Sequence, residues 1–288
     1  MPAATSATLT APRRRLPRIH GGQIALHVIL VVWTILCVYP FIWMAFASLK
    51  PFKELVSSRD LLPHVWTLKN YSDIINRVNF VSAFRNSVIA AVSVTLAQLL
   101  TSSALGFIFA KYRFVGKELL FMLLLATMMV PFAVVMVPLY ITVSNLHMVD
   151  QLSGIIIPGL WSTFGIFMMR QFMESIPGEL IDAARIDGAS EWRIFFTIVI
   201  PMAASPMGAL AVFTFLGSWD SLLWPLIVLT APQKQTLPLV LAGLRSLYWN
   251  RYDMWAAGSM LTVIPVMLIY SFASRYFIRG IAMTGLKA

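Results

Sequence analysis

The sequence predicts an all-α integral membrane protein with six transmembrane helices. Hydrophobic residues make up 59% of the 288-residue chain and charged residues only 12%, whereas soluble domains carry roughly 25% charged residues. Six apolar runs reach the length of about 20 residues that a helix needs to cross a bilayer. Each run must be helical, because lipid offers an exposed backbone no hydrogen-bond partners and no run alternates like a barrel strand.

The six runs cover residues 24–48, 83–110, 119–143, 152–173, 197–229 and 254–278. The fifth run is long enough for a span and a bend. Basic residues precede the first run, as in a signal peptide, but the apolar region of a signal is only about 7–15 residues long, so we interpret this run as a retained helix. The predicted division is a tail at 1–22, a transmembrane domain at 23–280 and a second tail at 281–288.

Prolines lie inside several of these runs. Each one removes a helix hydrogen bond and bends the helix axis. Membrane helices tolerate proline, and kinked helices also line cavities, so proline alone leaves both interpretations open. The prolines concerned are Pro40, Pro131, Pro138, Pro158, Pro206, Pro225 and Pro265.

The net charge of +10 gathers at the ends of the apolar runs. Four arginines precede the first run, and three basic residues separate the second run from the third. Lysine and arginine next to a membrane favour its cytoplasmic side and contact anionic lipid there. With six spans, both termini are therefore expected in the cytoplasm. No basic stripe is interleaved with aromatic residues, so nucleic acid is not an expected partner.

Residue patterns for catalysis and for metal binding are missing from the sequence. Gly116-Lys117 is followed by Glu118 and lacks the earlier glycine of a phosphate loop, so the chain is not expected to bind ATP. The four histidines are scattered without metal-ligand spacing. The single cysteine, Cys37, lies inside the first run. No nucleophile lies beside a base at catalytic spacing, so we expect no enzyme activity, cofactor or metal in this chain.

A polar segment at 174–193 separates the fourth run from the fifth and holds five of the twelve acidic residues. Pro177 suits the first turn of a helix, and Glu179 suits its positive end. Gly188 suits the left-handed position after a helix, and Ser190 can cap the next one. The segment thus predicts a short surface helix, a sharp stop and a return to the membrane. From the residues alone, a solvated helix without a partner remains open.

The spacing within this segment resembles the EAA loop of permease subunits in binding-protein-dependent ABC importers. Asp182-Ala183-Ala184, three residues, Gly188, nine residues, Ile198, one residue and Ile200-Pro201 follow one another. Asp182 stands where glutamate is usual, and Ile200 stands where leucine is usual.

Other segments are similar to the smaller of the two permeases in sugar importers of the maltose type. They are Ser48-Leu49-Lys50-Pro51 with Glu54, Asn70-Tyr71, Asn86-Ser87, the stretch 107–114, and 219–226, where Ser221 replaces the common phenylalanine. The C-terminal stretch 275–288 also matches, except that Thr284 and Ala288 replace glycines. The resemblance implies the type I ABC importer permease fold, multi-pass in a bacterial or archaeal cell membrane.

The resemblance also implies partners and roles. The expected partners are a second permease, a cytosolic ABC ATPase dimer that binds ATP and Mg²⁺, an extracytoplasmic solute-binding protein, and membrane lipid. The EAA helix would dock on the ATPase through Asp182, Ala183, Ala184, Asp187, Gly188, Ile198 and Pro201. The tail would contact the ATPase through Gly280, Gly285 and Lys287.

The expected solute is a sugar or a sugar-like molecule, held by hydrogen bonds and aromatic stacking. Candidate residues of its pathway are Tyr140, Trp161, Trp219, Asp220 and Trp224. The aromatic residues among them are equally typical of packing and of the interfacial belt. The resemblance further implies that the partner permease supplies most of the solute site.

Three other classes of membrane protein are alternatives. An ion-gradient-driven secondary transporter usually has inverted repeats and ionisable residues within its spans, and here Asp220 is the one acidic candidate well inside a run. An ion channel needs a selectivity filter or a ring of charge, and neither is found. A membrane scaffold is the third class. None of the three needs an EAA loop.

Overall fold

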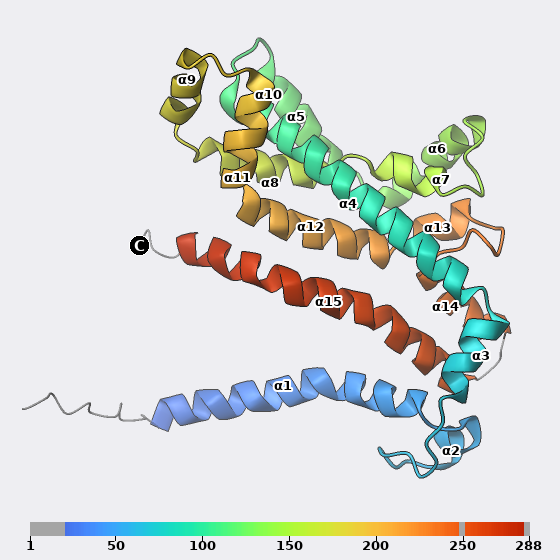
Figure 1. Ribbon diagram of the computed structural model, residues 1–288. Helices are drawn as coiled ribbons and strands as arrows, with labels where there is room; N and C mark the ends of the chain where they lie inside the picture. Colours follow the sequence, from blue (N-terminus) through green and yellow to red (C-terminus); the bar gives the residue numbers. More distant parts are fainter. Residues whose placement is uncertain (1–20, 248–250, 285–288) are drawn as a thin grey trace, which may run out of the picture. The chain divides into compact units, whose positions relative to one another are not determined.

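The computed structural model describes residues 21–247 and 251–284. The chain divides into two compact units, Met1–Trp43 and Met44–Ala288. The described part is built from helices and connecting loops and contains no β-strand (Figure 1). The all-α prediction is therefore confirmed for these residues.

The described part of the first unit is most of α1 (Gly21–Ser48), which is apolar on all sides. Ile29, Trp33 and Leu36 are each at least 60% exposed. A helix that exposes large apolar side chains around its whole circumference needs an apolar solvent, which the bilayer provides.

The second unit is organised around α4 (Phe80–Lys111), which packs against α8 (Thr163–Glu174) and α12 (Ala204–Trp219). Small residues allow α4 and α8 to approach closely. A Cβ atom on Gly106 would lie 2.7 Å from the Cβ of Met169 and 2.9 Å from the backbone nitrogen of Arg170. A Cβ atom on Gly165 would likewise overlap the Ser102 side chain. Small residues at such contacts are typical of helix packing in membranes.

Four of the predicted runs coincide with helices that are long and apolar enough to span a membrane. Among the described residues these are Gly22–Ser48, Phe80–Lys111, Ala204–Val228 and Tyr252–Ser271. The last lies within α15 (Tyr252–Thr284), which packs on α12 and on α3 (Lys69–Arg77).

The third and fourth runs are broken. The third consists of α5 (Lys117–Thr127) and α6 (Phe132–Asn145), bent by 97° before Pro131. The fourth is divided into α7 (Ser153–Ile156), η1 (Ile157–Gly159) and α8 rather than forming one continuous helix. Pro158 and Gly159 end the first part, and Ser162 starts α8 by accepting a hydrogen bond from the Gly165 N–H at 3.2 Å.

The fifth run contains the expected bend. α10 (Glu191–Ile194) continues into a π-helical turn η2 (Phe195–Val199) and then α11 (Ile200–Met202) before α12 begins. Pro201 has no N–H to donate, so the regular helix hydrogen bonding is interrupted next to this π-helical turn. After Trp219 the chain unwinds for three residues and forms α13 (Leu223–Val228).

Buried polar contacts hold together the end of the second unit that carries α2 (Phe52–Ser57), α3 and α14 (Leu237–Leu247). The Asn70 amide donates to the carbonyls of Ser48 and Lys50 at 2.9 and 2.7 Å. The Asn86 amide donates to the carbonyls of Gln233 and Gln235 at 2.9 and 3.0 Å. Asn70 and Asn86 thus anchor loops to helices.

Candidate functional site

The surface helix predicted in the polar segment is α9 (Gly178–Ile186). Pro177 takes the position just before the first helical residue, with φ −58° and ψ 130°, rather than a place in the first turn. At the other end Gly188 has φ +77°. Its N–H donates to the Arg185 carbonyl and the Ala189 N–H donates to the Ala184 carbonyl, both at 3.0 Å. These two bonds form a Schellman motif, so the predicted stop at Gly188 is confirmed.

The predicted restart is also confirmed. The Ser190 hydroxyl accepts a hydrogen bond from the Arg193 N–H at 3.3 Å and caps α10. We call the segment 174–193 the α9 loop below. Its two helices meet at a turn whose shape is set by Gly188 and Ser190.

One face of the α9 loop is anchored in the protein. Ile181 is 2% exposed and packs with Ile194, Phe107 and Met173. Ala184 joins the same cluster at its edge. Burial of this apolar face fixes the position of the short helix, which would be marginal on its own.

The opposite face of the α9 loop is exposed. Asp182, Ala183, Asp187 and Gly188 all lie there, together with Ile186, which is 87% exposed. Of the remaining residues expected to couple, Ile198 is half-buried and Pro201 is exposed farther along the chain. The helix α9 thus has one face packed against the protein and one face exposed.

A charged clamp closes the turn between α9 and α10. The Arg185 guanidinium donates from Nε to Glu191 Oε1 at 2.7 Å and from Nη2 to Oε2 at 3.2 Å. Its Nη1 also donates to Asp182 at 3.1 Å. The hydroxyl of Tyr112, which follows α4, donates to Glu191 as well, and Arg185 lies 5.7 Å from the centre of the Tyr112 ring. A two-point arginine–carboxylate contact fixes geometry as well as distance.

Hydrogen bonds from Arg185 and Tyr112 hold the pKa of Glu191 below its ordinary value. Burial, followed by the hydrogen bond to Glu191, raises the pKa of Tyr112. The three groups therefore keep their bonding protonation states across the neutral range. Nearby, the Lys111 ammonium donates to the carbonyls of Glu174 and Ile176, which ties the end of α4 to the start of the α9 loop.

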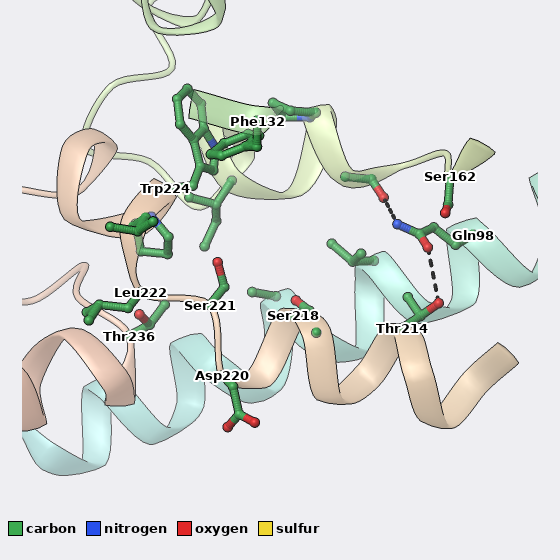
Figure 2. A pocket seen from close by; sticks show the side chains of 18 of the residues that line it. Gln98, Phe132, Ser162, Thr214, Ser218, Asp220, Ser221, Leu222, Trp224 and Thr236 are labelled. Atoms are coloured by element: carbon green, nitrogen blue, oxygen red, sulfur yellow. Dashed lines mark hydrogen bonds between the residues drawn. The ribbon is translucent and has the colours of Figure 1, made fainter. Parts of the chain in front are cut away.

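The second unit also contains a cavity of about 740 Å³. Its walls come from α4, α6, the α7–α8 region, α12 and α13 (Figure 2). The Gln98 amide on α4 donates to the Gly159 carbonyl at 2.8 Å and accepts from the Thr214 hydroxyl at 3.1 Å. Figure 2 shows this pair at one end of the cavity, with Thr236 and Leu222 at the other.

The predicted pathway residues are only partly brought together. Trp224 lines the cavity, and Asp220 lies at its edge with its carboxylate directed away from the other lining side chains in Figure 2. Trp219 is 1% exposed, stacks on Phe215, and donates from its indole to the Thr262 carbonyl at 3.3 Å. It therefore packs in the core and does not line the cavity.

The two other predicted pathway residues lie away from the cavity lining. Tyr140 is half-buried on α6 beside the cluster around Val143, and Trp161 is 54% exposed between η1 and α8.

Hydrogen bonds connect α7 and α13, the two short helices that border the cavity. Asp150, at φ +56°, accepts hydrogen bonds from the Thr230 hydroxyl at 2.7 Å and from the Ala231 N–H at 2.8 Å. These bonds lower the pKa of Asp150. The Trp224 indole donates to the Gly154 carbonyl at 3.1 Å. Together the contacts hold α7 and α13 in one place.

Several site residues were not predicted from the sequence. Gln98 is an amide in the middle of an apolar run, which is a signal that was available. No sequence pattern predicts the contact among Arg185, Glu191 and Tyr112. For the expected tail contacts, Gly280 lies within α15, whereas Gly285 and Lys287 lie outside the described residues.

Comparison with known proteins gives a consistent answer. Residues 102–282 match the family model described as "Binding-protein-dependent transport system inner membrane component". The arabinooligosaccharides transport system permease protein AraQ of Bacillus subtilis is 36% identical over 95% of this chain and 99% of its own length. The lactose transport system permease protein LacG of Rhizobium radiobacter is 33% identical over 94% and 97%.

A solved structure shares the fold. A chain of a bacterial ABC transporter involved in the import of the acidic polysaccharide alginate superposes with a TM-score of 0.80, at 21% identity, over 91% of this chain and all of that one. The fold is therefore that of a type I ABC importer permease. Family match, relatives and fold agree that this chain belongs to the binding-protein-dependent transport system inner membrane components, as a permease subunit of a carbohydrate ABC importer.

Proposed function

We propose that this chain and a second permease together form the translocation pathway for a sugar, driven by a cytosolic ATPase dimer that docks on the α9 loop. An extracytoplasmic solute-binding protein delivers the sugar. ATP and Mg²⁺ bind to the ATPase, since this chain has no phosphate loop. Both termini and the α9 loop face the cytoplasm.

The names of the relatives support the sugar class. They are permeases for arabinooligosaccharides, lactose and diacetylchitobiose. A second solved structure of the same fold, at 16% identity and a TM-score of 0.64, is that of an alginate transporter in complex with a periplasmic protein bound to an alginate pentasaccharide. It supports a binding-protein partner for this chain.

The observation that carries the ATPase contact is the two-faced α9 loop. Its outer face is exposed, with Ile186 at 87%. Its inner face is fixed by Ile181, by the clamp to Tyr112 and by the Lys111 contacts. Movement of an ATPase docked on the outer face would therefore also move α4 and α8. These helices reach the cavity, through Gln98 of α4 and through Ser162, which caps α8.

Co-purification tests the docking surface. The chain is expressed with its second permease and an affinity-tagged ATPase, and the retained permease is measured. Ile186→Asp should release the chain from the ATPase, because the change places a charge on the outer apolar surface. Val115→Asp is the matched control, because Val115 is a fully exposed residue of a loop predicted on the same side. Equal retention of both variants would refute docking at the α9 loop.

A further inference from the structure

The connection between α1 and α3 exposes several large apolar side chains. We call residues 51–69, which include α2, the α2 loop. Single apolar residues are common on protein surfaces, but a group of them in one short segment marks a contact with a membrane or with another protein. The group, with exposed fractions between 58% and 71%, consists of Val56, Leu62, Val65, Trp66 and Leu68.

The conformation of the α2 loop is fixed by hydrogen bonds from within the protein. The Glu54 carboxylate accepts from the backbone N–H groups of His64 and Val65 at 2.7 and 3.1 Å. Lys50, which is 3% exposed, donates to the Asp60 carbonyl. The apolar side chains are thus carried by a backbone that is already ordered, so a contact with them costs little further entropy.

Both ends of the α2 loop lie at the end of α1. The Thr67 N–H donates to the Leu49 carbonyl at 2.9 Å, so the chain returns to the residue that follows α1 (Figure 1). The Trp66 ring packs edge-to-face on Phe46, with 6.2 Å between the ring centres. Phe46 is two residues before Ser48, the last residue of the span, and lies about 3 Å from it along the helix axis.

The length of this span places its end in the headgroup region of a bilayer. The span has 27 residues and is therefore about 40 Å long, which is roughly the thickness of a bilayer with its headgroups. Through its contact with Phe46, Trp66 lies at the same depth. Tryptophan is enriched at this depth in membrane proteins, because its ring is apolar and its N–H is polar.

The α2 loop also carries cations without partners. Lys53, Arg59 and Lys69 are exposed, and their side chains form no hydrogen bond or ion pair with the parts of the chain that the structure describes. The two carboxylates of the loop, on Glu54 and Asp60, are bonded within it. Apolar side chains beside free cations fit a lipid surface, since long basic side chains can reach the headgroups while apolar ones enter the acyl chains.

We propose that the α2 loop is an interfacial lipid anchor. It lies in the membrane surface at the end of α1, with Leu62, Val65, Trp66 and Leu68 at the boundary between headgroups and acyl chains. Its three free cations bind anionic phospholipid headgroups. A protein partner is the competing occupant, and the depth set by Phe46 favours lipid. The inference adds a lipid contact outside the spans and does not depend on the proposed transport function.

Fluorescence quenching tests the position of the loop. In a Cys37→Ser background, Leu62→Cys and Leu68→Cys each carry a bimane label, in the transporter assembled with cysteine-free partners in nanodiscs. Lipids with a doxyl group near the headgroup should quench both labels, and aqueous iodide should lose most of its effect on them. Gln233→Cys is the matched control, because Gln233 is exposed in the loop between α13 and α14. Its label should be quenched by iodide.

The same measurement separates lipid from the other occupants. Iodide quenching at Leu62 and Leu68 as strong as at Gln233 would place the α2 loop in water. Protection from both iodide and doxyl lipid would show that a protein covers it. Protection that appears only after a solute-binding protein is added would assign the surface to that protein. Each of these results overturns the proposal. Both leucines are exposed, so neither substitution removes a packed side chain.

The role of the cations is tested with the Leu68 label. Spin-labelled phosphatidylglycerol should quench it more than spin-labelled phosphatidylcholine, with a local enrichment on the order of fivefold for one cation held at an anionic headgroup. Lys53→Gln, Arg59→Gln and Lys69→Gln together should abolish this preference. Lys234→Gln, which neutralises an exposed lysine of the α13–α14 loop, should leave it unchanged. Equal quenching by the two lipids before any cation is replaced would overturn the binding of anionic headgroups.

Discussion

Arg185 and Glu191 face each other across the turn at Gly188 and share two hydrogen bonds, at 2.7 and 3.2 Å. The pair joins the last turn of α9 to the first turn of α10. Both side chains are more than a third exposed, so the pair adds little to global stability. The two hydrogen bonds fix the angle between the two helices, and under the proposed function this angle would determine how movement of a docked ATPase is passed from the α9 loop to α4.

We expect loss of the clamp to uncouple the transporter. Arg185→Ala and Glu191→Ala should each lower the amount of solute imported per ATP hydrolysed, because α9 can then move without moving α10. The double variant should be no worse than the poorer single variant, since the two residues act as one unit. The measurement is uptake and ATP hydrolysis in proteoliposomes. Arg193→Ala is the control, as this exposed arginine has no side-chain partner among the described residues. Additive losses would contradict a shared role.

The lowered pKa of Glu191 predicts a pH dependence of stability. A carboxyl whose pKa is lower in the folded state contributes stability above its unfolded pKa of about 4.3, and this contribution disappears as pH falls through the folded value. The difference in melting temperature between the parent complex and Glu191→Gln should therefore be constant near neutral pH and shrink below about pH 4. Solvent screening keeps the underlying effect under about 1 kcal/mol. A difference that grows in acid would have the wrong sign.

Gly188→Val should impair transport, because φ +77° costs a residue with a Cβ about 1–2 kcal/mol. Gly116→Val is a matched control. Gly116 has φ +80°, and at both glycines a Cβ would meet no atom within 4 Å. The two variants thus carry similar backbone strain, but only Gly188 shapes the α9 loop. Uptake and ATPase co-purification should fall for Gly188→Val alone, at membrane levels equal to the control. Similar losses in both would point to general strain instead.

Sequence predicted those parts of the α9 loop that depend on local chemistry. Gly188 and Ser190 act on backbone groups within a few positions, so their residue types were sufficient. The clamp could not be predicted, because Tyr112 is 79 residues from Glu191 and only tertiary packing brings them together. Gln98 and Thr214, 116 residues apart, gave no hint of each other for the same reason.

The broken fourth run shows a different limit. Residues 152–173 are apolar enough for a span, but counting apolar residues ignores local breaks. Pro158 removes a backbone donor, and the Ser162 cap satisfies the N–H of Gly165 at a new helix start. The length criterion therefore registers one span where the backbone forms separate helical pieces.

The predicted topology can be tested with reporter fusions. A reporter active only in the cytosol should give signal after Ala288, and one active only outside the membrane should give signal after Gln233. Gln233 is exposed in the loop between α13 and α14, so a reporter fused after it reports the side of the membrane on which this loop lies. The expectation follows from the basic residues before the first span. Inverted signals from the two fusions would reverse the proposed orientation and place the α9 loop on the wrong side for an ATPase.

The close approach of α4 and α8 predicts a large effect from a small substitution. The added Cβ of Gly106→Ala would lie 2.7 Å from the Met169 Cβ and 2.9 Å from a backbone nitrogen, and neither atom belongs to the end of a flexible side chain. The helices must separate, at a cost of about 1–3 kcal/mol typical of overpacking. Thermal unfolding of the purified complex should show a lower midpoint.

Gly217→Ala is the control for this effect. It lies within α12, and a Cβ there would meet no atom within 4 Å. Alanine stabilises a helix interior relative to glycine by about 0.5–1 kcal/mol, so this variant should unfold at the same temperature as the parent or slightly higher. Because α4 and α8 both carry cavity residues, Gly106→Ala should also reduce uptake. If its unfolding midpoint matched that of Gly217→Ala, the tight contact would have no energetic role, and another contact would have to hold the two helices together.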